Sequence, residues 1–373
     1  MGMKNRRGNQ KSPPVFSHEF VIQNHADIVS CFAMVFVVGL MFQATTPFSS
    51  LFVALGHPTP PEIGSFYTYG LKDISCIFFY LLICIIVQAV VQEYLIDRMN
   101  RKLHLSKVNH RKFNESGQLL VFYLVSVFWG ANIAHKEGLL SDLTGLWSNY
   151  PDAHARMSFQ QKFFFIIQIA YWLHQFPELY FQKIKKDEVM QRVQMAFQYL
   201  VAIVVAYLFN FTKLALCFLV IHYASESVFH VARILHLAGK QVAARKAFMV
   251  RNVVYVPVRI LAIVASVSVF IFKLAKEKQG FDFATGNFNT QLIRLNCAIS
   301  MFFSQSWLLW NYVSFHLRKR SERVAQTTVH VPKKKAHRPK PEPKQTNEED
   351  VNELPEVDQN TSKDLRQRKV PAK

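Results

Sequence analysis

The chain has 373 residues; 50% of them are hydrophobic, and phenylalanine alone occurs 33 times. This composition predicts a polytopic membrane protein and argues against a soluble globular protein. Lys and Arg number 44 against 25 Asp and Glu. Such an excess occurs both in nucleic-acid-binding proteins and in the cytosolic loops of membrane proteins, so the positions of the basic residues decide between these classes. All five cysteines lie within apolar runs, which predicts no disulfide framework.

The first 27 residues are polar and basic, and the first apolar run begins near Ile28 with no small-residue cleavage pattern after it. We therefore interpret residues 1–27 as a cytosolic N-terminus followed by a retained span. A membrane-spanning helix needs about 20 apolar residues, and eight segments come near this length. They are residues 28–47, 73–96, 118–135, 162–181, 195–211, 214–232, 252–272 and 292–316. The predicted fold class is an all-α polytopic membrane protein with about eight transmembrane helices.

The orientation of these spans follows from the basic residues of the loops. If the N-terminus is cytosolic, the loops on the cytosolic side hold 19 Lys and Arg, and those on the opposite side hold 8. Because basic residues favour short cytosolic loops, this asymmetry predicts that both termini are cytosolic. It also accounts for most of the net charge of +19, and it therefore disfavours a nucleic-acid-binding function.

The C-terminal residues 321–373 alternate a basic block with an acidic block and are punctuated by proline. Such a segment cannot bury enough apolar area to offset its chain entropy, so we predict a disordered, charged cytosolic tail. The lysines at 333–335 suggest that the tail touches ribosomal RNA. The alternative is a tail that is merely solvated.

Three unusual residues occur in the apolar sequence YWLHQFPELYF, residues 171–181. His174 and Glu178 are four residues apart and therefore share one helix face. Pro177 lacks a backbone donor, so we expect a helix kink there. An ionisable residue inside a membrane normally faces the bundle interior and has a partner.

The sixth predicted span carries a similar polar stripe, because His222, Glu226 and His230 are spaced by four residues. The seventh and eighth spans contribute Arg259 and Arg294, which we expect to be the counter-charges of Glu178 and Glu226. Together these residues predict a polar intramembrane cavity. Its predicted lining is His174, Glu178, His222, Glu226, His230, Arg259 and Arg294, with Pro177 at the kink.

Three interpretations of this polar set remain open. It is a network that specifies helix packing, a cavity for a lipid or another amphipathic ligand, or a site of catalysis or metal binding. The spacing HxxxExxxH differs from HExxH, and a stripe two turns long is too extended for one ion, so we predict no metal site. The chain contains no P-loop, GxSxG, GxGxxG or CxxC motif. We therefore predict no cofactor, no catalytic residue and a non-enzyme.

Several longer stretches carry a resemblance to a known family. They are SPPVFSHEFVIQNHADIVSC (12–31), KFNESGQL (112–119), YWLHQFPELYFQKIKK (171–186) and FDFATGNFN (281–289). These stretches closely resemble the translocating chain-associated membrane protein (TRAM) family of the endoplasmic reticulum, and the similarity covers about residues 12–320. The resemblance implies two N-terminal spans within 28–117 and, over 118–320, a TLC domain of six spans, the helical fold shared with ceramide synthases.

The resemblance also implies a function and a set of partners. A protein of this family assists at the Sec translocon of the endoplasmic reticulum membrane, where it contacts signal sequences and transmembrane segments of nascent secretory and membrane polypeptides. The further expected partners are membrane phospholipids and, through the basic loops and tail, the ribosome. On this basis we expect a passive mechanism: a cavity open to lipid, lined by His174, Glu178, His222 and Glu226, lets such segments leave the translocon gradually.

The relation to ceramide synthases supplies the rival interpretation, a lipid-binding or acyl-transferring TLC protein. Those enzymes carry an adjacent histidine pair in the helix corresponding to the fifth span, followed by an HD…D motif in the next. The present chain reads VMQRVQMA at 189–196, without histidine, and HYASE at 222–226, with Tyr223 in place of the first aspartate. Acyl transfer to an amine needs a base. The missing histidine pair therefore disfavours this chemistry and favours a binding scaffold.

Overall fold

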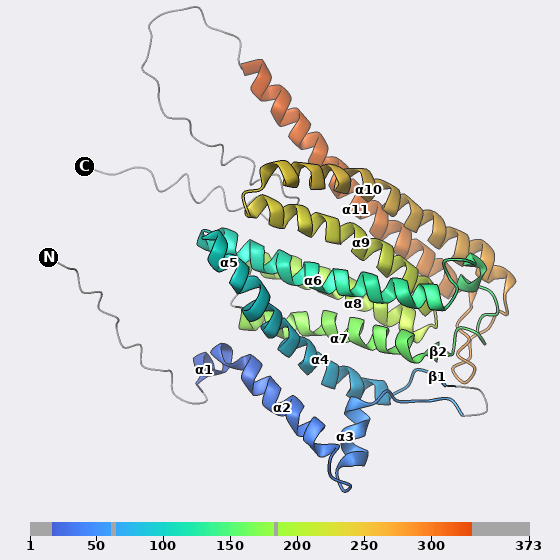
Figure 1. The fold of residues 1–373 in the computed structure, drawn as a ribbon. Helices are drawn as coiled ribbons and strands as arrows, with labels where there is room; N and C mark the ends of the chain where they lie inside the picture. Colours follow the sequence, from blue (N-terminus) through green and yellow to red (C-terminus); the bar gives the residue numbers. More distant parts are fainter. Residues whose placement is uncertain (1–16, 61–64, 183–185, 330–373) are drawn as a thin grey trace, which may run out of the picture.

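The computed structural model describes residues 17–60, 65–182 and 186–329, and these form an all-α bundle with one short pair of strands (Figure 1). The first elements are α1 (His18–Gln23), α2 (His25–Gly39), α3 (Thr46–Val53), β1 (Phe66–Tyr67), α4 (Lys72–Val90), α5 (Asp97–Leu103) and α6 (Lys107–Lys136). The later elements are β2 (Met157–Ser158), α7 (Phe159–Phe181), α8 (Lys186–Leu208), α9 (Thr212–Leu237), α10 (Gln241–Val267) and α11 (Gln291–Val329). A π-helical segment, Val91–Ile96, joins α4 to α5, and another, Ser268–Lys273, follows α10.

Five helical stretches of the described chain are long and apolar enough to cross a membrane. They are Lys72–Leu103, Lys107–Lys136, Glu188–Leu208, Thr212–Leu237 and Gln241–Lys276. Each coincides with one of the predicted spans, so the chain is an all-helical, multi-pass membrane protein. The other three predicted spans fall on α2, α7 and α11, and the total of eight stays a prediction.

The first predicted span, 28–47, does not form one helix. α2 stops at Gly39, and α3 starts at Thr46 with Pro47 in its first turn, where the missing N–H has no cost. The Thr45 hydroxyl donates to the carbonyl of Gly39 at 2.7 Å, and the Thr46 hydroxyl donates to that of Phe42 at 2.8 Å. The first bond satisfies a carbonyl at the end of α2 and the second one in the turn between α2 and α3. The hydrophobicity of the sequence did not indicate this turn.

The last helix is longer than predicted. α11 continues to Val329, past residue 321, where we placed the start of the disordered tail. The helical segment 321–329 carries charged residues suited to a solvated helix. The remainder of the predicted tail, residues 330–373, lies outside the described residues, as do residues 1–16 of the predicted N-terminus.

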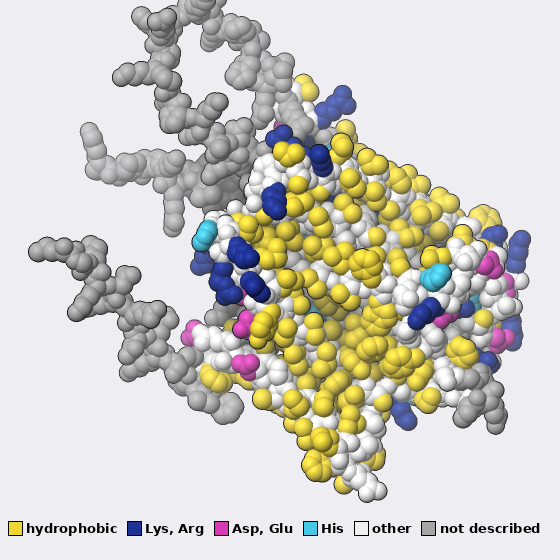
Figure 2. Space-filling view, in the orientation of Figure 1, with side chains coloured by type: hydrophobic (Ala, Val, Ile, Leu, Met, Phe, Trp, Pro, Cys, Tyr) yellow, Lys and Arg dark blue, Asp and Glu magenta, His cyan; other side chains and the backbone are white. Residues whose placement is uncertain are grey.

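The long helices pack in two layers. α4, α7 and α8 form one layer, with α2 and α3 on the outer side of α4, whereas α6, α9, α10 and α11 form the other. Figure 1 shows the helices running along a common direction, with α1, α5 and the α9–α10 turn at one end and β1 and β2 at the other. We call these the basic end and the loop end. In Figure 2 apolar side chains cover the face between the two ends, and charged side chains gather at the ends, as expected for a bundle surrounded by lipid.

A buried ion pair ties the loop before α4 to α7 and α8. Lys162 Nζ lies 2.7 Å from Asp73 Oδ1, and both side chains are almost fully buried. The Lys162 ammonium also donates to the carbonyls of Gly56 at 2.9 Å and Thr68 at 2.6 Å, while the Tyr207 hydroxyl donates to Asp73 Oδ2 at 2.8 Å. Both charges are therefore compensated, which a buried pair requires to avoid a large desolvation penalty.

The loop end is a folded cap. Strands β1 and β2 pair antiparallel, with Phe66 opposite Ser158. The Tyr150 hydroxyl donates to the carbonyl of Phe209 at 2.9 Å and accepts from the Phe288 N–H at 3.1 Å. Asn210, the first residue of the glycosylation sequon Asn-Phe-Thr at 210–212, is fully buried and donates to the carbonyl of Gly286 at 2.9 Å.

His154 makes the stability of this cap depend on pH. Burial, together with the positive charge of Lys213, lowers the pKa of His154 from 6.5 to about 4. Between these values the unfolded chain binds a proton that the folded chain does not, so the free energy of unfolding falls as the pH falls, by about 2 kcal/mol at pH 5. Above pH 6.5 the effect disappears. We therefore expect His154→Gln to lose less thermal stability than the wild type between pH 7 and pH 5.

The measurement is thermal unfolding of the purified protein in detergent at the two pH values. His135→Gln is the matched control, because His135 is exposed at the end of α6. This control should lose as much stability as the wild type. An equal loss of thermal stability between pH 7 and pH 5 in the wild type and in His154→Gln would show that His154 does not cause the pH dependence.

Candidate functional site

The sequence YWLHQFPELYF forms the C-terminal half of α7, and His174 is completely buried within it. One ring nitrogen of His174 contacts the carbonyl of Tyr171, and the other contacts the side chain of Gln88 on α4. α7 continues past Pro177 to Phe181, so a kink at Pro177 stays a prediction. His174 thus joins two helices of the same layer.

Glu178 is also buried, and it lies beside the start of α2. Its Oε1 accepts from Gln182 Nε2 at 2.9 Å, and its Oε2 lies 3.9 Å from Nε2 of His25. The His25 ring stacks on Phe181 at 4.4 Å between centroids, and His18 contacts the hydroxyl of Tyr180. Two histidines therefore fasten the N-terminal helices to the end of α7. Neither contact was predicted, and no helical periodicity could have indicated them, because His18 and His25 lie on different helices.

The second polar group lies between α9, α10 and α11. Arg259 donates to Glu226 Oε1 at 2.8 Å and to Gln305 Oε1 at 3.2 Å, so the expected pairing of Glu226 with an arginine is present. Arg259 also contacts Nδ1 of His222. Because guanidinium can only donate, Nδ1 accepts, and the ring proton lies on Nε2, which faces the hydroxyl of Tyr199. Both ring nitrogens of His222 are therefore engaged.

His230 and Arg294 do not join this group. Within the described residues, His230 Nδ1 has no hydrogen-bond partner, and its ring packs 5.5 Å from that of Tyr123. The stripe of His222, Glu226 and His230 therefore does not converge. Arg294 lies at the loop end and donates to the carbonyl and Oδ1 of Asn289 at 3.3 and 3.0 Å. It is not the counter-charge of Glu178, because α11 packs on α10, in the other layer.

Aromatic rings separate the two polar groups. Trp172 stacks on Tyr199 with centroids 4.0 Å apart, and its Nε1 donates to the Tyr223 hydroxyl at 2.9 Å. That hydroxyl donates in turn to Gln168 at 3.0 Å, and Gln168 donates to Ser126 at 3.0 Å. Tyr223 thus joins the layers at the centre. The rings of Trp172, Tyr199 and Tyr223 pack between the two polar groups.

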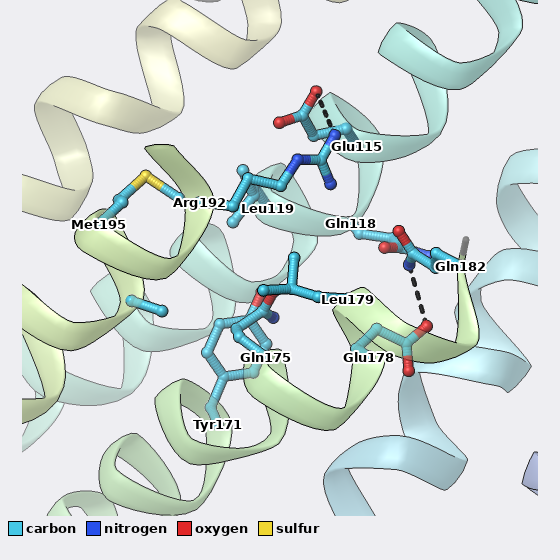
Figure 3. Close-up of a pocket in the computed structure, with 11 residues that line it drawn as sticks. Glu115, Gln118, Leu119, Tyr171, Gln175, Glu178, Leu179, Gln182, Arg192 and Met195 are labelled. Carbon is cyan, nitrogen blue, oxygen red and sulfur yellow. Dashed lines mark hydrogen bonds and ion pairs between the residues drawn. The ribbon is translucent and has the colours of Figure 1, made fainter. Parts of the chain in front are cut away.

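A small cavity of about 30 Å³ opens instead between α6, α7 and α8 near the basic end (Figure 3). This volume has room for about two water molecules. Its polar lining consists of Glu115, Gln118, Gln175, Glu178, Gln182 and Arg192. Glu178 is the member of the predicted set that belongs to this lining.

Ion pairs lie beside the cavity on the side of α8 and α9. Arg192 lies 3.3 Å from Glu115 Oε2, and Arg233 lies 3.5 Å from the same oxygen. Beside them Arg111 pairs with Glu188 at 2.6 Å. These residues come from α6, α8 and α9, so they also link the two layers. In the sequence these residues lie in predicted loops or near the ends of predicted spans. There the arginines were counted among the basic residues that orient the protein in the membrane.

Comparison with known proteins agrees with this architecture. Residues 112–314, more than half of the chain, match the model of the TLC domain. The fold and this match define a multi-pass membrane protein with a TLC domain.

The family follows from more similar proteins. Two proteins named translocating chain-associated membrane protein 2, from Homo sapiens and Mus musculus, are each 43% identical over 317 residues, covering 84% of this chain and 85% of theirs. The chain therefore belongs to the translocating chain-associated membrane protein family. More distant relatives are a sphingosine N-acyltransferase-like protein of Alternaria alternata, 28% identical over 52% of this chain and 44% of its own, and a ceramide synthase of Gibberella moniliformis, 26% identical over 55% and 47%.

The Glu226–Arg259 pair provides a direct test of the second polar group. Arg259 is 1% exposed, so Glu226→Gln leaves a buried cation without its counter-charge. We expect this variant to lose about 3–5 kcal/mol of stability, and Glu226→Leu combined with Arg259→Met to recover much of that loss. The measurement is the unfolding temperature and yield in detergent. Glu93→Gln, at an exposed carboxylate, should behave as the wild type, whereas a double variant as unstable as the single one would contradict a paired role.

Proposed function

We propose that the protein is an accessory component of the translocation machinery of the endoplasmic reticulum. In this role it contacts signal sequences and transmembrane segments of nascent chains during SRP-dependent cotranslational targeting and assists their translocation and insertion. The observation that carries the proposal is the 43% identity over 84% of the chain to proteins named for association with translocating chains. Its proposed partners are the Sec translocon, nascent polypeptides and membrane phospholipids.

We propose further that both termini lie in the cytosol. The exposed basic side chains of α5, including Arg98, Arg101 and Lys102, lie at the same end as α1. The α9–α10 turn adds the exposed Lys240 and Arg245 at this end. Figure 2 shows the basic cluster of α5 at this end. Such a cluster fits the cytosolic side of the membrane and is the part of the described chain best suited to touch the ribosome.

The proposed role is that of a binding scaffold and not of an enzyme. His222 has both ring nitrogens occupied, and His174 is fully buried between helices. Positions 189–196 on α8 contain no histidine. A lipid-modifying activity like that of the acyltransferase relatives needs a base, and it is the alternative that these contacts and the missing histidine pair disfavour.

The outer surface of α8 is the proposed contact for client segments. α8 packs mainly on α7, and its outer face exposes Phe197 and Val201 next to the amides of Gln194 and Gln198. Polar groups facing lipid are costly for the protein, but they offer hydrogen bonds to a weakly hydrophobic or charged segment leaving the translocon. Such a surface lowers the insertion cost of marginal segments more than that of strongly apolar ones.

This mechanism predicts a difference between clients. Replacing the protein in reconstituted membranes by a Gln194→Leu/Gln198→Leu variant should reduce translocation of chains with weak signal sequences about fivefold, which corresponds to about 1 kcal/mol. Chains with strong signals should be little affected. The measurement is protease protection of newly made chains, with Gln241→Leu, an exposed glutamine at the start of α10, as control. Equal effects on weak and strong signals would contradict the mechanism.

A further inference from the structure

The cavity near the basic end contains two carboxylates, and one of them, Glu178, has no lysine or arginine partner among the described residues. Glu115 has Arg192 and Arg233 beside it, at 3.3 and 3.5 Å. Within the described part of the chain, the ion pair of Glu178 is with His25 alone, and its 3.9 Å separation exceeds a hydrogen bond. The Glu178 side chain is only 9% exposed. A carboxylate buried to this degree is costly unless it is paired, so a bound cation would stabilise it.

The cavity also offers acceptors beside Glu178, while its one arginine, Arg192, is paired with Glu115. Gln118 uses its Nε2 to donate to Gln92 at 2.8 Å, and Gln182 uses its Nε2 to donate to Glu178 at 2.9 Å. Within the described residues no hydrogen bond to Oε1 of Gln118 or Gln182 is present, so both oxygens can accept. Figure 3 shows Gln118 and Gln182 next to Glu178, with Gln175 and Tyr171 farther along α7. A carboxylate and two amide oxygens match the three N–H donors of a primary ammonium group.

The size and depth of the cavity further restrict which ligands can bind. About 30 Å³ accepts one ammonium group in place of two water molecules but not a bulky headgroup. Glu178 precedes the end of α7 at Phe181 by three residues, or about 5 Å along the helix axis. The headgroup layer is about 5–7 Å thick, so with the end of α7 at the membrane surface Glu178 would lie near the boundary between headgroups and acyl chains. The ligand therefore reaches the cavity from that boundary.

We propose that this cavity binds a primary ammonium group, held by Glu178 and the neighbouring glutamine oxygens. The group comes either from the headgroup of an ethanolamine phospholipid or from a lysine that flanks a client transmembrane segment. The second source rests on the proposed function, whereas the first is independent of it.

The first experiment uses lipids and the purified full-length protein. Native mass spectrometry in detergent compares binding of phosphatidylethanolamine, its N,N-dimethyl derivative and phosphatidylcholine, which differ in the number of N–H donors. If the lipid is the source, affinity falls at least about tenfold from the primary to the quaternary ammonium, and Glu178→Gln removes the preference. Glu93→Gln, at an exposed carboxylate near the same end, keeps it. The affinities for the three lipids are compared on the wild-type protein. This comparison therefore tests the proposal even if Glu178→Gln folds poorly.

The second experiment tests lysine as the source. A photocrosslinker at Gln175 is used during translation of a chain whose transmembrane segment is flanked by lysine or, in the matched client, by glutamine. Adducts with the lysine client that are lost in Glu178→Gln, together with no preference among the lipids, assign the site to clients. No preference in either experiment, or a preference that Glu178→Gln retains, overturns the proposal. A preference among the lipids without client adducts supports the ammonium site with the lipid as its ligand. It contradicts only the binding of client lysines.

Discussion

The contact on which the bundle depends is the hydrogen-bonded cluster around Tyr223, where the two helix layers meet. Lipid tails are as apolar as leucine, so burial of apolar side chains does little to bring helices together inside a membrane. Tyr223 accepts from Trp172 and donates to Gln168, and Gln168 continues to Ser126. Without its partners on the opposite layer, each of these buried groups would be unsatisfied in an apolar medium. The cluster therefore fixes both the spacing and the register of the layers.

Similar links occur on either side of this centre. At the basic end Glu115 pairs with Arg192, and at the loop end Gln161 donates to Thr212 at 3.1 Å. The layers are thus held at three heights, and the rings of Trp172, Tyr199 and Tyr223 occupy the space between. Large aromatic side chains thus occupy the centre of the described bundle between the two layers. This is the physical reason to favour contacts on its outside and in the small cavity over chemistry in its interior.

The sequence predicted the features that depend on helical periodicity. The apolar runs located five long apolar helices, and the expectation that Glu226 has an arginine as its counter-charge is met by Arg259. Features that depend on which helices become neighbours were missed. The ion pair of Lys162 with Asp73 was not predicted, because the two residues lie on different helices, and Arg294, expected to be a counter-charge of Glu178 or Glu226, instead contacts Asn289. The break in the helix after Gly39 was missed because the apolar run continues through it, and hydrogen bonds from threonine hydroxyls do not change the hydrophobicity of the sequence.

The central claim is that the interior is closed and that client chains meet the outer face of α8. Its most direct test is photocrosslinking with p-benzoyl-phenylalanine placed at Phe197, which is 58% exposed, or at Phe164, which is 0% exposed. The label is activated while a signal-bearing chain is translated into membranes that contain folded protein. The account predicts adducts to the nascent chain from position 197 and none from position 164. Adducts from position 164 without adducts from position 197 would contradict it.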